Sequence, residues 1–139
     1  MPSWEQWRLE FDDRMPIYRQ IILRFSQAFV RGNIQPGERI PSIRELSALL
    51  KVNTNTIQRA YQEMERDEMI NGKRGTGYFL TEDGKMIEKI RRNLAQESLN
   101  RFAGEMRALG CADREIMEEL ELFMKGGKKH ANNLRNLRP

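Results

Sequence analysis

Four hydrogen-bonding side chains, Thr54, Asn55, Gln58 and Arg59, stand at positions i, i+1, i+4 and i+5 of the sequence. On a helix, this spacing places them on one patch of the surface. Asparagine and glutamine can form two hydrogen bonds with adenine, arginine can do so with guanine, and a threonine methyl group suits thymine. The patch therefore favours the reading of base edges, while a redundant helix cap with a solvated face is the alternative interpretation.

Lys73 and Arg74 form a second candidate site, beside Gly75 and Gly77 in the stretch KRGTGYF. The stretch lacks the Gly-Lys-Ser/Thr sequence of a nucleotide-binding loop, and it is predicted to be a tight turn between two strands. Glycine lets a backbone approach a ligand closely, so the two cations could touch a phosphate or a minor groove. Two charges that only keep a turn hydrated are the alternative.

Apolar spacing predicts the helices that must position these residues. A first helix is expected over residues 16–33, with Pro16 in its first turn and Gly32 at its end. A Pro-Gly pair predicts the turn that follows, before a short extended piece at residues 38–40. The buried face of the first helix is expected to hold Ile17, Ile21, Phe25, Ala28 and Phe29.

A helix-turn-helix is predicted next. Ser42 and Glu45 form a capping box that opens a short second helix, which ends near Lys51. Asn53 is expected to cap a third helix, and the pair makes a helix-turn-helix whose second member has a polar N-terminal face. Arg44 lies where the helix dipole disfavours a positive charge, which favours a nucleic-acid contact. The buried faces of these two helices are expected to hold Ile43, Leu46, Leu49, Leu50, Ile57, Ala60, Tyr61 and Met64.

Residues 69–80 alternate as a small hairpin in which Ile70 and Phe79 face inward. Three helices followed by such a hairpin make a winged helix. The predicted fold is therefore mainly α with a small β wing, and residues 1–81 are assigned to a winged-helix DNA-binding domain.

The pattern then changes to two amphipathic helices, one over about 83–109 and one that is capped by Asp113 and ended by Gly126-Gly127. Two helices alone cannot cover both apolar faces, so a second copy of the chain is expected to cover them. We assign residues 82–127 to a two-helix dimerisation module and residues 128–139 to a basic disordered tail. The residues predicted at the dimer contact are Ile87, Ile90, Leu94, Phe102, Met106, Leu120 and Phe123.

Composition argues against an enzyme. His130 is the only histidine and Cys111 the only cysteine, which leaves no metal-ligand cluster, no nucleophile–histidine set and no internal disulfide. No cofactor is expected. The sequence contains no apolar stretch of membrane-spanning length and no secretory signal at its start, so a cytoplasmic protein is expected. The net charge of +4 concentrates in the middle of the chain and in the tail, which suggests a polyanionic partner.

The stretches PIYRQI, PGERIPSIRELSALLKVNTNTIQRAYQEMERDEMI and RGTGYFL closely resemble the GntR family of bacterial winged-helix transcription regulators. The stretch RALGCADREIMEELELFM is similar to the two-helix dimerisation module of the YtrA subfamily, so the resemblance covers roughly residues 8–124. It implies a cytoplasmic homodimer that binds a palindromic operator, usually as a repressor and often of its own operon. Members of this subfamily commonly lie beside ABC-transporter genes.

The resemblance also implies which residues meet DNA. Many family members carry arginine where Thr54 and Gln58 stand here, so this chain is expected to read a different, more A·T-rich half-site. On the family's pattern, the DNA-contacting residues are Arg44, Thr54, Asn55, Thr56, Gln58, Arg74, Gly75 and Thr76.

Any small-molecule effector would have to lie at the dimer interface or between domains, because the chain lacks the ligand-binding domain of the larger subfamilies.

Two other functions remain alternatives at this point. A winged helix without sequence-specific DNA readout could serve as a protein-interaction module, and its binding would then depend weakly on salt. An RNA-binding protein would need exposed aromatic side chains for stacking, but Tyr61, Tyr78 and Phe79 are at positions expected to be buried. Trp4 and Trp7 are better explained as an N-terminal anchor against the domain or a partner.

Overall fold

A computed structural model describes residues 4, 7 and 9–136, with side chains described through residue 126. The protein is mostly helical, with five helices and one small antiparallel sheet of three strands in this part of the chain. The chain divides into two compact units, Met1–Leu94 and Ala95–Pro139. Each unit is described in turn.

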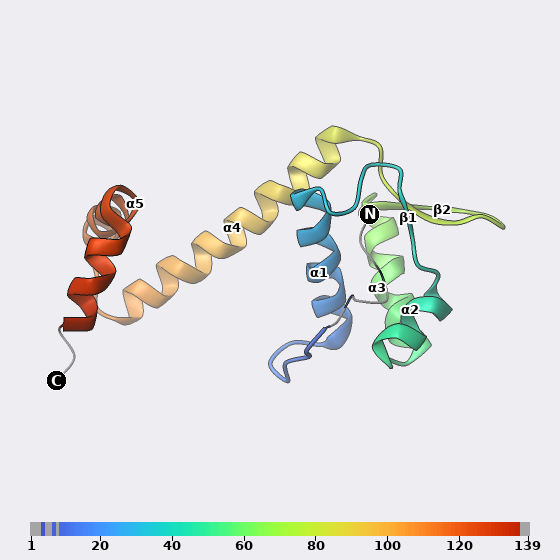
Figure 1. Cartoon of the computed structure of the whole chain (residues 1–139), viewed down its shortest axis with the longest axis horizontal. Coiled ribbons are helices and arrows are strands. Elements are labelled where there is room, and N and C mark those ends of the chain that lie inside the picture. The colour runs from blue at the N-terminus through green and yellow to red at the C-terminus, as the bar shows by residue number, and fades with distance from the viewer. Residues whose placement is uncertain (1–3, 5–6, 8, 137–139) are drawn as a thin grey trace. The chain divides into compact units, whose positions relative to one another are not determined.

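Helix α1 (Ile17–Arg31) has the predicted ends (Figure 1). Gly32 closes it with φ 78°, a left-handed conformation that suits glycine, and its N–H bonds to carbonyl oxygens of the last turn. The prediction that Ile17 is buried is wrong, because this residue begins the helix and is 39% exposed, whereas Tyr18 is buried. The remaining predicted residues, Ile21, Phe25, Ala28 and Phe29, are buried.

Helices α2 (Ile43–Leu50) and α3 (Thr54–Arg66) form the helix-turn-helix. Both halves of the Ser42–Glu45 capping box are present, and the Asn53 side chain accepts a hydrogen bond from the Asn55 N–H at 2.8 Å. The four predicted residues of α3 are buried, whereas in α2 only Leu46 is fully buried among the four predicted. Capping by Ser42 and Asn53 therefore sets where α2 and α3 begin.

The sheet joins β1 (Arg39–Ile40), β2 (Ile70–Lys73) and β3 (Gly77–Leu80) in the order β1-β3-β2. The extended piece before α2 is thus a third strand, whose place in the sheet the sequence pattern does not indicate. Phe79 is not the inward partner of Ile70, because Ile70 pairs with Leu80 and side chains alternate along a strand. Leu80 is 1% exposed, whereas Phe79 is partly exposed.

A chain of aromatic ring contacts runs through the core from Trp7 to Tyr78 on the wing. The centroids of Trp7 and Phe25 are 4.5 Å apart, those of Phe25 and Tyr61 are 5.9 Å apart, and those of Tyr61 and Tyr78 are 5.0 Å apart. The Tyr61 hydroxyl donates to the Pro41 carbonyl at 2.6 Å, and burial raises the pKa of this phenol. Trp7 therefore packs into the core of the domain, in agreement with one of the two predicted alternatives.

Helix α4 (Gly84–Ala108) belongs to both units. In the first unit Ile90 joins the winged-helix core, Leu94 packs against it, and Arg91 Nη2 donates to the Val30 carbonyl at 2.9 Å. The boundary between the compact units consequently lies after residue 94, inside α4, and differs from the predicted boundary at 81/82.

Helix α5 (Asp113–Asn136) begins where predicted but is not capped by Asp113, whose carboxylate instead accepts a hydrogen bond from Arg107 Nε at 2.9 Å. Gly126 has the non-helical angles φ −139° and ψ 34°, which matches the predicted break. Helical backbone nevertheless resumes after this break and continues to Asn136. Residues 128–136 are therefore helical in the structure, whereas the sequence predicts a disordered tail there; the lysine, alanine and leucine residues of this stretch favour helix. Residues 137–139 of that tail lie outside the described residues.

Candidate nucleic-acid interface

The N-terminal half of α3 presents the predicted base-reading patch. Thr54, Asn55 and Gln58 are exposed, and Thr56 is partly buried. The helix period separates them from the face that Ile57 turns into the core. The patch therefore combines amide and hydroxyl groups on a helix whose opposite face is buried in the core, which suits hydrogen bonding to base edges in a major groove.

Arg59 is held differently from the rest of this patch. Its guanidinium carbon lies 3.9 Å from the centroid of the Tyr18 ring, and its Nη2 donates to the Tyr18 hydroxyl at 3.2 Å. Its Nε is 3.9 Å from a carboxylate oxygen of Glu63. The structure thus places this arginine against α1, whereas the sequence pattern groups it with the base readers.

The wing carries its predicted contact residues at the tip of the β2–β3 hairpin. The Thr76 N–H donates to the Lys73 carbonyl at 2.9 Å, which closes a tight turn, and Gly75 adopts φ 75° within it. Lys73, Arg74, Gly75 and Thr76 are all exposed. Lys73 Nζ lies 5.0 Å from the centroid of the Phe79 ring. The tip therefore offers two cations and an accessible backbone.

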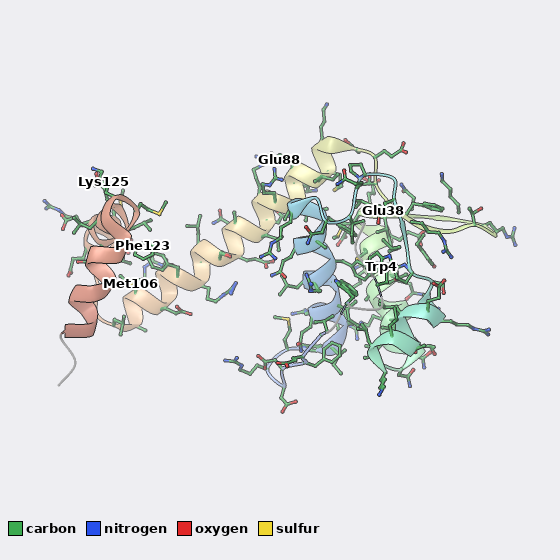
Figure 2. All side chains as sticks on the ribbon, in the orientation of Figure 1. Trp4, Glu38, Glu88, Met106, Phe123 and Lys125 are labelled. Atoms are coloured by element: carbon green, nitrogen blue, oxygen red, sulfur yellow. The ribbon has the colours of Figure 1, made fainter. Side chains whose placement is uncertain are left out.

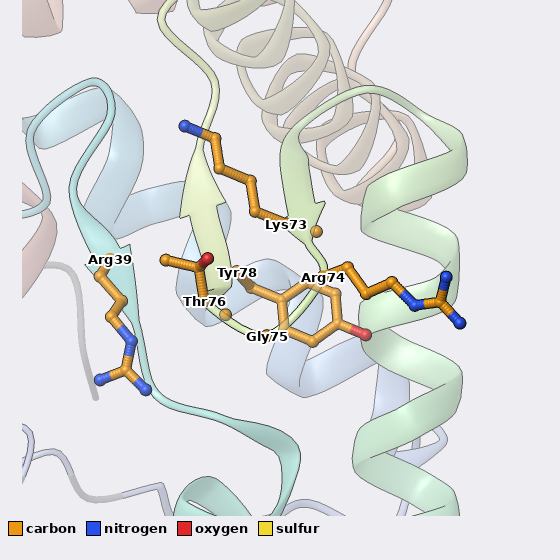
Figure 3. A pocket seen from close by; sticks show the side chains of 8 residues that line it. Arg39, Lys73, Arg74, Gly75, Thr76 and Tyr78 are labelled. Atoms are coloured by element: carbon orange, nitrogen blue, oxygen red, sulfur yellow. The ribbon is translucent and has the colours of Figure 1, made fainter.

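Arg39 on β1 is a candidate contact residue that the sequence motifs do not reveal. It shares with the wing tip a surface depression of about 440 Å³, and Figure 3 shows it on the strand beside the tip, with Lys73 and Arg74 pointing in different directions. A Cβ on Gly77, which has φ 127°, would lie 2.9 Å from Arg39 Nε. Only the pairing of β1 with β3 brings this arginine to the wing.

Glu45 connects the capping box to Arg39. Its carboxylate accepts from the Ser42 N–H at 3.4 Å and from Arg39 Nη2 at 3.3 Å. Hydrogen bonding with Ser42, followed by the contribution of Arg39, lowers the pKa of the Glu45 carboxyl. Arg44 is exposed in the first turn of α2 and lies outside the residues that line the depression. The structure therefore gathers Arg39 with the wing but leaves Arg44 as a separate cation.

A second candidate surface is an apolar groove between the two helices of the C-terminal unit, with a volume of about 520 Å³. Figure 2 shows Met106 and Phe123, which both line it. Of the predicted dimer residues, Ile90 and Leu94 instead pack with the winged helix, and Ile87 is partly buried. The groove is lined by Ser98, Leu99, Phe102, Met106, Glu119, Leu120 and Phe123.

Other classes of site find no support in the described part of the chain. Over residues whose placement is described, no three His, Cys, Asp or Glu side chains gather in a way that could hold a metal ion. Within the same ranges no helix is long and apolar enough to cross a membrane. Cys111 is a partly buried free thiol.

Known proteins are similar to this chain in both sequence and fold. The sequence model of the family described as bacterial regulatory proteins, gntR family, matches residues 17–80. The chain is 37% identical over 118 residues to the HTH-type transcriptional regulator YhcF of Bacillus subtilis, covering 85% of this chain and 98% of that protein. It is 32% identical over 119 residues to the HTH-type transcriptional repressor YtrA of the same organism, covering 83% and 92%. The solved structure of a GntR family transcriptional regulator from Listeria monocytogenes matches with a TM-score of 0.72 and 40% identity, covering 80% of this chain and 97% of that one.

Proposed function

Because the chain belongs to the GntR family of bacterial DNA-binding transcription regulators, we propose that it acts in the cytoplasm as a dimeric repressor that binds a palindromic operator. We propose its own operon as the target, including any ABC-transporter genes within it. The repressor role is supported by the likeness to YtrA, which is named as a repressor.

The observation that carries the proposal is the exposed polar face at the start of α3. Thr54, Asn55 and Gln58 project from a capped helix whose other side is anchored in the core. In a helix-turn-helix, this end of the second helix enters the major groove. Amide side chains there favour contacts with adenine, so we propose a half-site rich in A·T pairs.

The proposed dimer is supported by apolar surface in the C-terminal unit. Leu99 and Phe123 are more than half exposed although both line the groove between α4 and α5. A large exposed apolar surface on a small unit is typical of a protein–protein interface. Two copies related by a twofold axis would present two recognition helices, which is why an inverted repeat is expected in the operator.

The test is a selection of random DNA duplexes on the full chain, followed by sequencing. The expected result is an inverted repeat that binds at least about 10³-fold more tightly than a scrambled duplex near physiological salt. Transcription from a promoter that overlaps this repeat should fall when the protein is added. Equal affinity for the repeat and the scrambled duplex would make the protein-interaction module the better description, and increased transcription would replace repression by activation.

A further inference from the structure

Two arginines from different helices meet at one tyrosine hydroxyl on the surface of the winged helix. Tyr18, near the start of α1, is only 8% exposed, so its ring is a fixed support. Its hydroxyl oxygen accepts one hydrogen bond from Arg19 Nε and one from Arg59 Nη2, each at 3.2 Å. The guanidinium of Arg59 also stacks on the ring at 3.9 Å. The two positively charged groups are therefore held close together around one oxygen atom.

The balance of charge around this oxygen is positive. A carboxylate that faces the two arginines is that of Glu63, whose Oε1 is 3.9 Å from Arg59 Nε, beyond hydrogen-bond distance. The same oxygen is also 3.9 Å from Arg66 Nη2, so Glu63 is shared between two cations. Like charges that are held close together repel each other, and an anion bound between them would relieve this repulsion.

The hydrogen-bonding inventory of the site also suits an anion. A guanidinium has five N–H groups, and each arginine gives one of them to Tyr18, so most donors remain available. The two lone pairs of the Tyr18 oxygen accept from the arginines, which leaves the hydroxyl proton to be donated elsewhere. Among the hydrogen bonds of the described residues, the Tyr18 hydroxyl only accepts and donates none. A tetrahedral oxyanion could accept from all three side chains at once.

We propose that Arg19, Arg59 and Tyr18 form a binding site for one phosphate of the DNA backbone, at the flank of the base-reading surface of α3. This proposal rests on the proposed function and deepens it. Arg59 directly follows Gln58 on α3, so a duplex whose bases reach Gln58 would bring its backbone near this site. The site would fix how the helix lies in the groove, because phosphate contacts set register and orientation. Arg59 then binds the backbone and does not read a base.

The experiment measures affinity against salt concentration for the selected operator and a scrambled duplex. The variants are Arg19→Ala, Arg59→Ala, the double variant, and Tyr18→Phe, which keeps the ring but lacks the hydroxyl. Arg66→Ala is the matched control, since it removes the same charge from the same helix and the same carboxylate neighbour. The slope of log K against log salt should fall by about 0.9 for each phosphate that the protein no longer neutralises, hence by about twice that for a dimer of the double variant. Tyr18→Phe should bind both duplexes several-fold more weakly.

Each outcome bears on the proposal. The phosphate site is supported if the variants bind the operator and the scrambled duplex more weakly to a similar extent and the slope of log K against log salt falls. Arg66→Ala must keep the wild-type slope. Loss on the operator alone would show that Arg59 reads a base, and an unchanged slope in the double variant would remove the site. If Arg59→Ala lowers the thermal midpoint because it loses the contact with Tyr18 on another helix, Arg19→Ala provides the measurement, since Arg19 lies beside Tyr18 on α1 itself. Wild-type protein that cannot tell the two duplexes apart would instead contradict the proposed function.

Discussion

Individual side chains at this interface differ in what they can contribute to recognition. Gln58 presents an amide that can make two hydrogen bonds to a base, and this kind of contact depends on sequence. Arg74 at the wing tip carries a charge on a tight turn, where contact with a phosphate is expected. Replacing these two residues by alanine should therefore change the affinity for DNA in different ways.

Gln58→Ala should weaken operator binding by about 1–3 kcal/mol and relax the preference at one base pair in each half-site. Gln62→Ala is the matched control, because this residue is the next exposed glutamine on α3, one turn farther from the N-terminal end. Titration of both variants against operators substituted at each position provides the measurement. If Gln58→Ala binds operator and scrambled duplex as the wild type does, α3 is not the reader.

Arg74→Ala should weaken the operator and a scrambled duplex to a similar extent, because a phosphate contact carries no sequence information. The salt slope should fall by about 0.9 for each phosphate that the wing ceases to neutralise. Titrations at several salt concentrations measure both effects. A weakening confined to the operator would instead indicate that the wing reads a base.

At the scale of elements, the helix-turn-helix depends on the cap of its first helix. The Ser42 side chain accepts from the Glu45 N–H at 3.1 Å, while the Glu45 carboxylate accepts in return and also pairs with Arg39 on β1. The cap thus links the start of α2 to the strand beside the wing. A weakened cap should disturb two parts of the proposed DNA-binding surface together.

Ser42→Ala should lower the stability by about 1 kcal/mol, the usual effect of losing an N-cap side chain. Chemical denaturation followed by circular dichroism measures this change. Wild-type stability within a few tenths of a kcal/mol would show that the cap contributes little here.

Glu45→Gln should reveal a pH-dependent part of the same cap. Because the folded-state pKa of Glu45 lies below its ordinary value of 4.5, its stabilisation is present above that value and is lost as the pH falls through the lower folded pKa. The stabilities of the wild type and the variant should therefore converge in acid. Glu97→Gln, on an exposed position of α4, is the control for the change in charge. A difference that persists unchanged into strong acid would contradict this account.

At the scale of the whole molecule, the apolar residues of α4 serve two different units. Ile90 belongs to the winged-helix core and Leu94 packs against it, while Phe102 and Met106 line the groove of the C-terminal unit. A substitution at Leu94 would therefore damage the DNA-binding domain itself. The proposed dimer contact has to be tested beyond residue 94.

Phe102→Asp should yield monomers, because a buried charge in an apolar interface has no partner. Leu109→Asp is the control, since Leu109 is highly exposed and lies outside the groove. Light scattering at micromolar concentration measures the mass of each variant, and circular dichroism checks that both remain folded. A wild-type chain that is monomeric under these conditions would contradict the dimer.

The features that could be predicted from the sequence are local ones. Pro16, Gly32 and the Ser42–Glu45 pair act on their own neighbourhood, so the helix ends are predictable within a residue or two. The register of the sheet depends on pairing between distant segments, and the alternation therefore assigns the inward position to Phe79 when it belongs to Leu80. The periodicity of α3 could not show where Arg59 points, since its partner Tyr18 is 41 positions away. The roles of the exposed site residues remain predictions.

The ring cluster at the N-terminal segment has an optical consequence. Trp4 and Trp7 are the only tryptophans of the protein, and their ring centroids lie 5.2 Å apart and within 6.0 Å of Phe25 on α1. All tryptophan emission therefore originates where these two rings pack against the core. Trp7 is 7% exposed, so its emission should lie at short wavelength and shift to the red when this side chain leaves the core. The fluorescence of this protein consequently monitors the packing of Trp4 and Trp7 against Phe25.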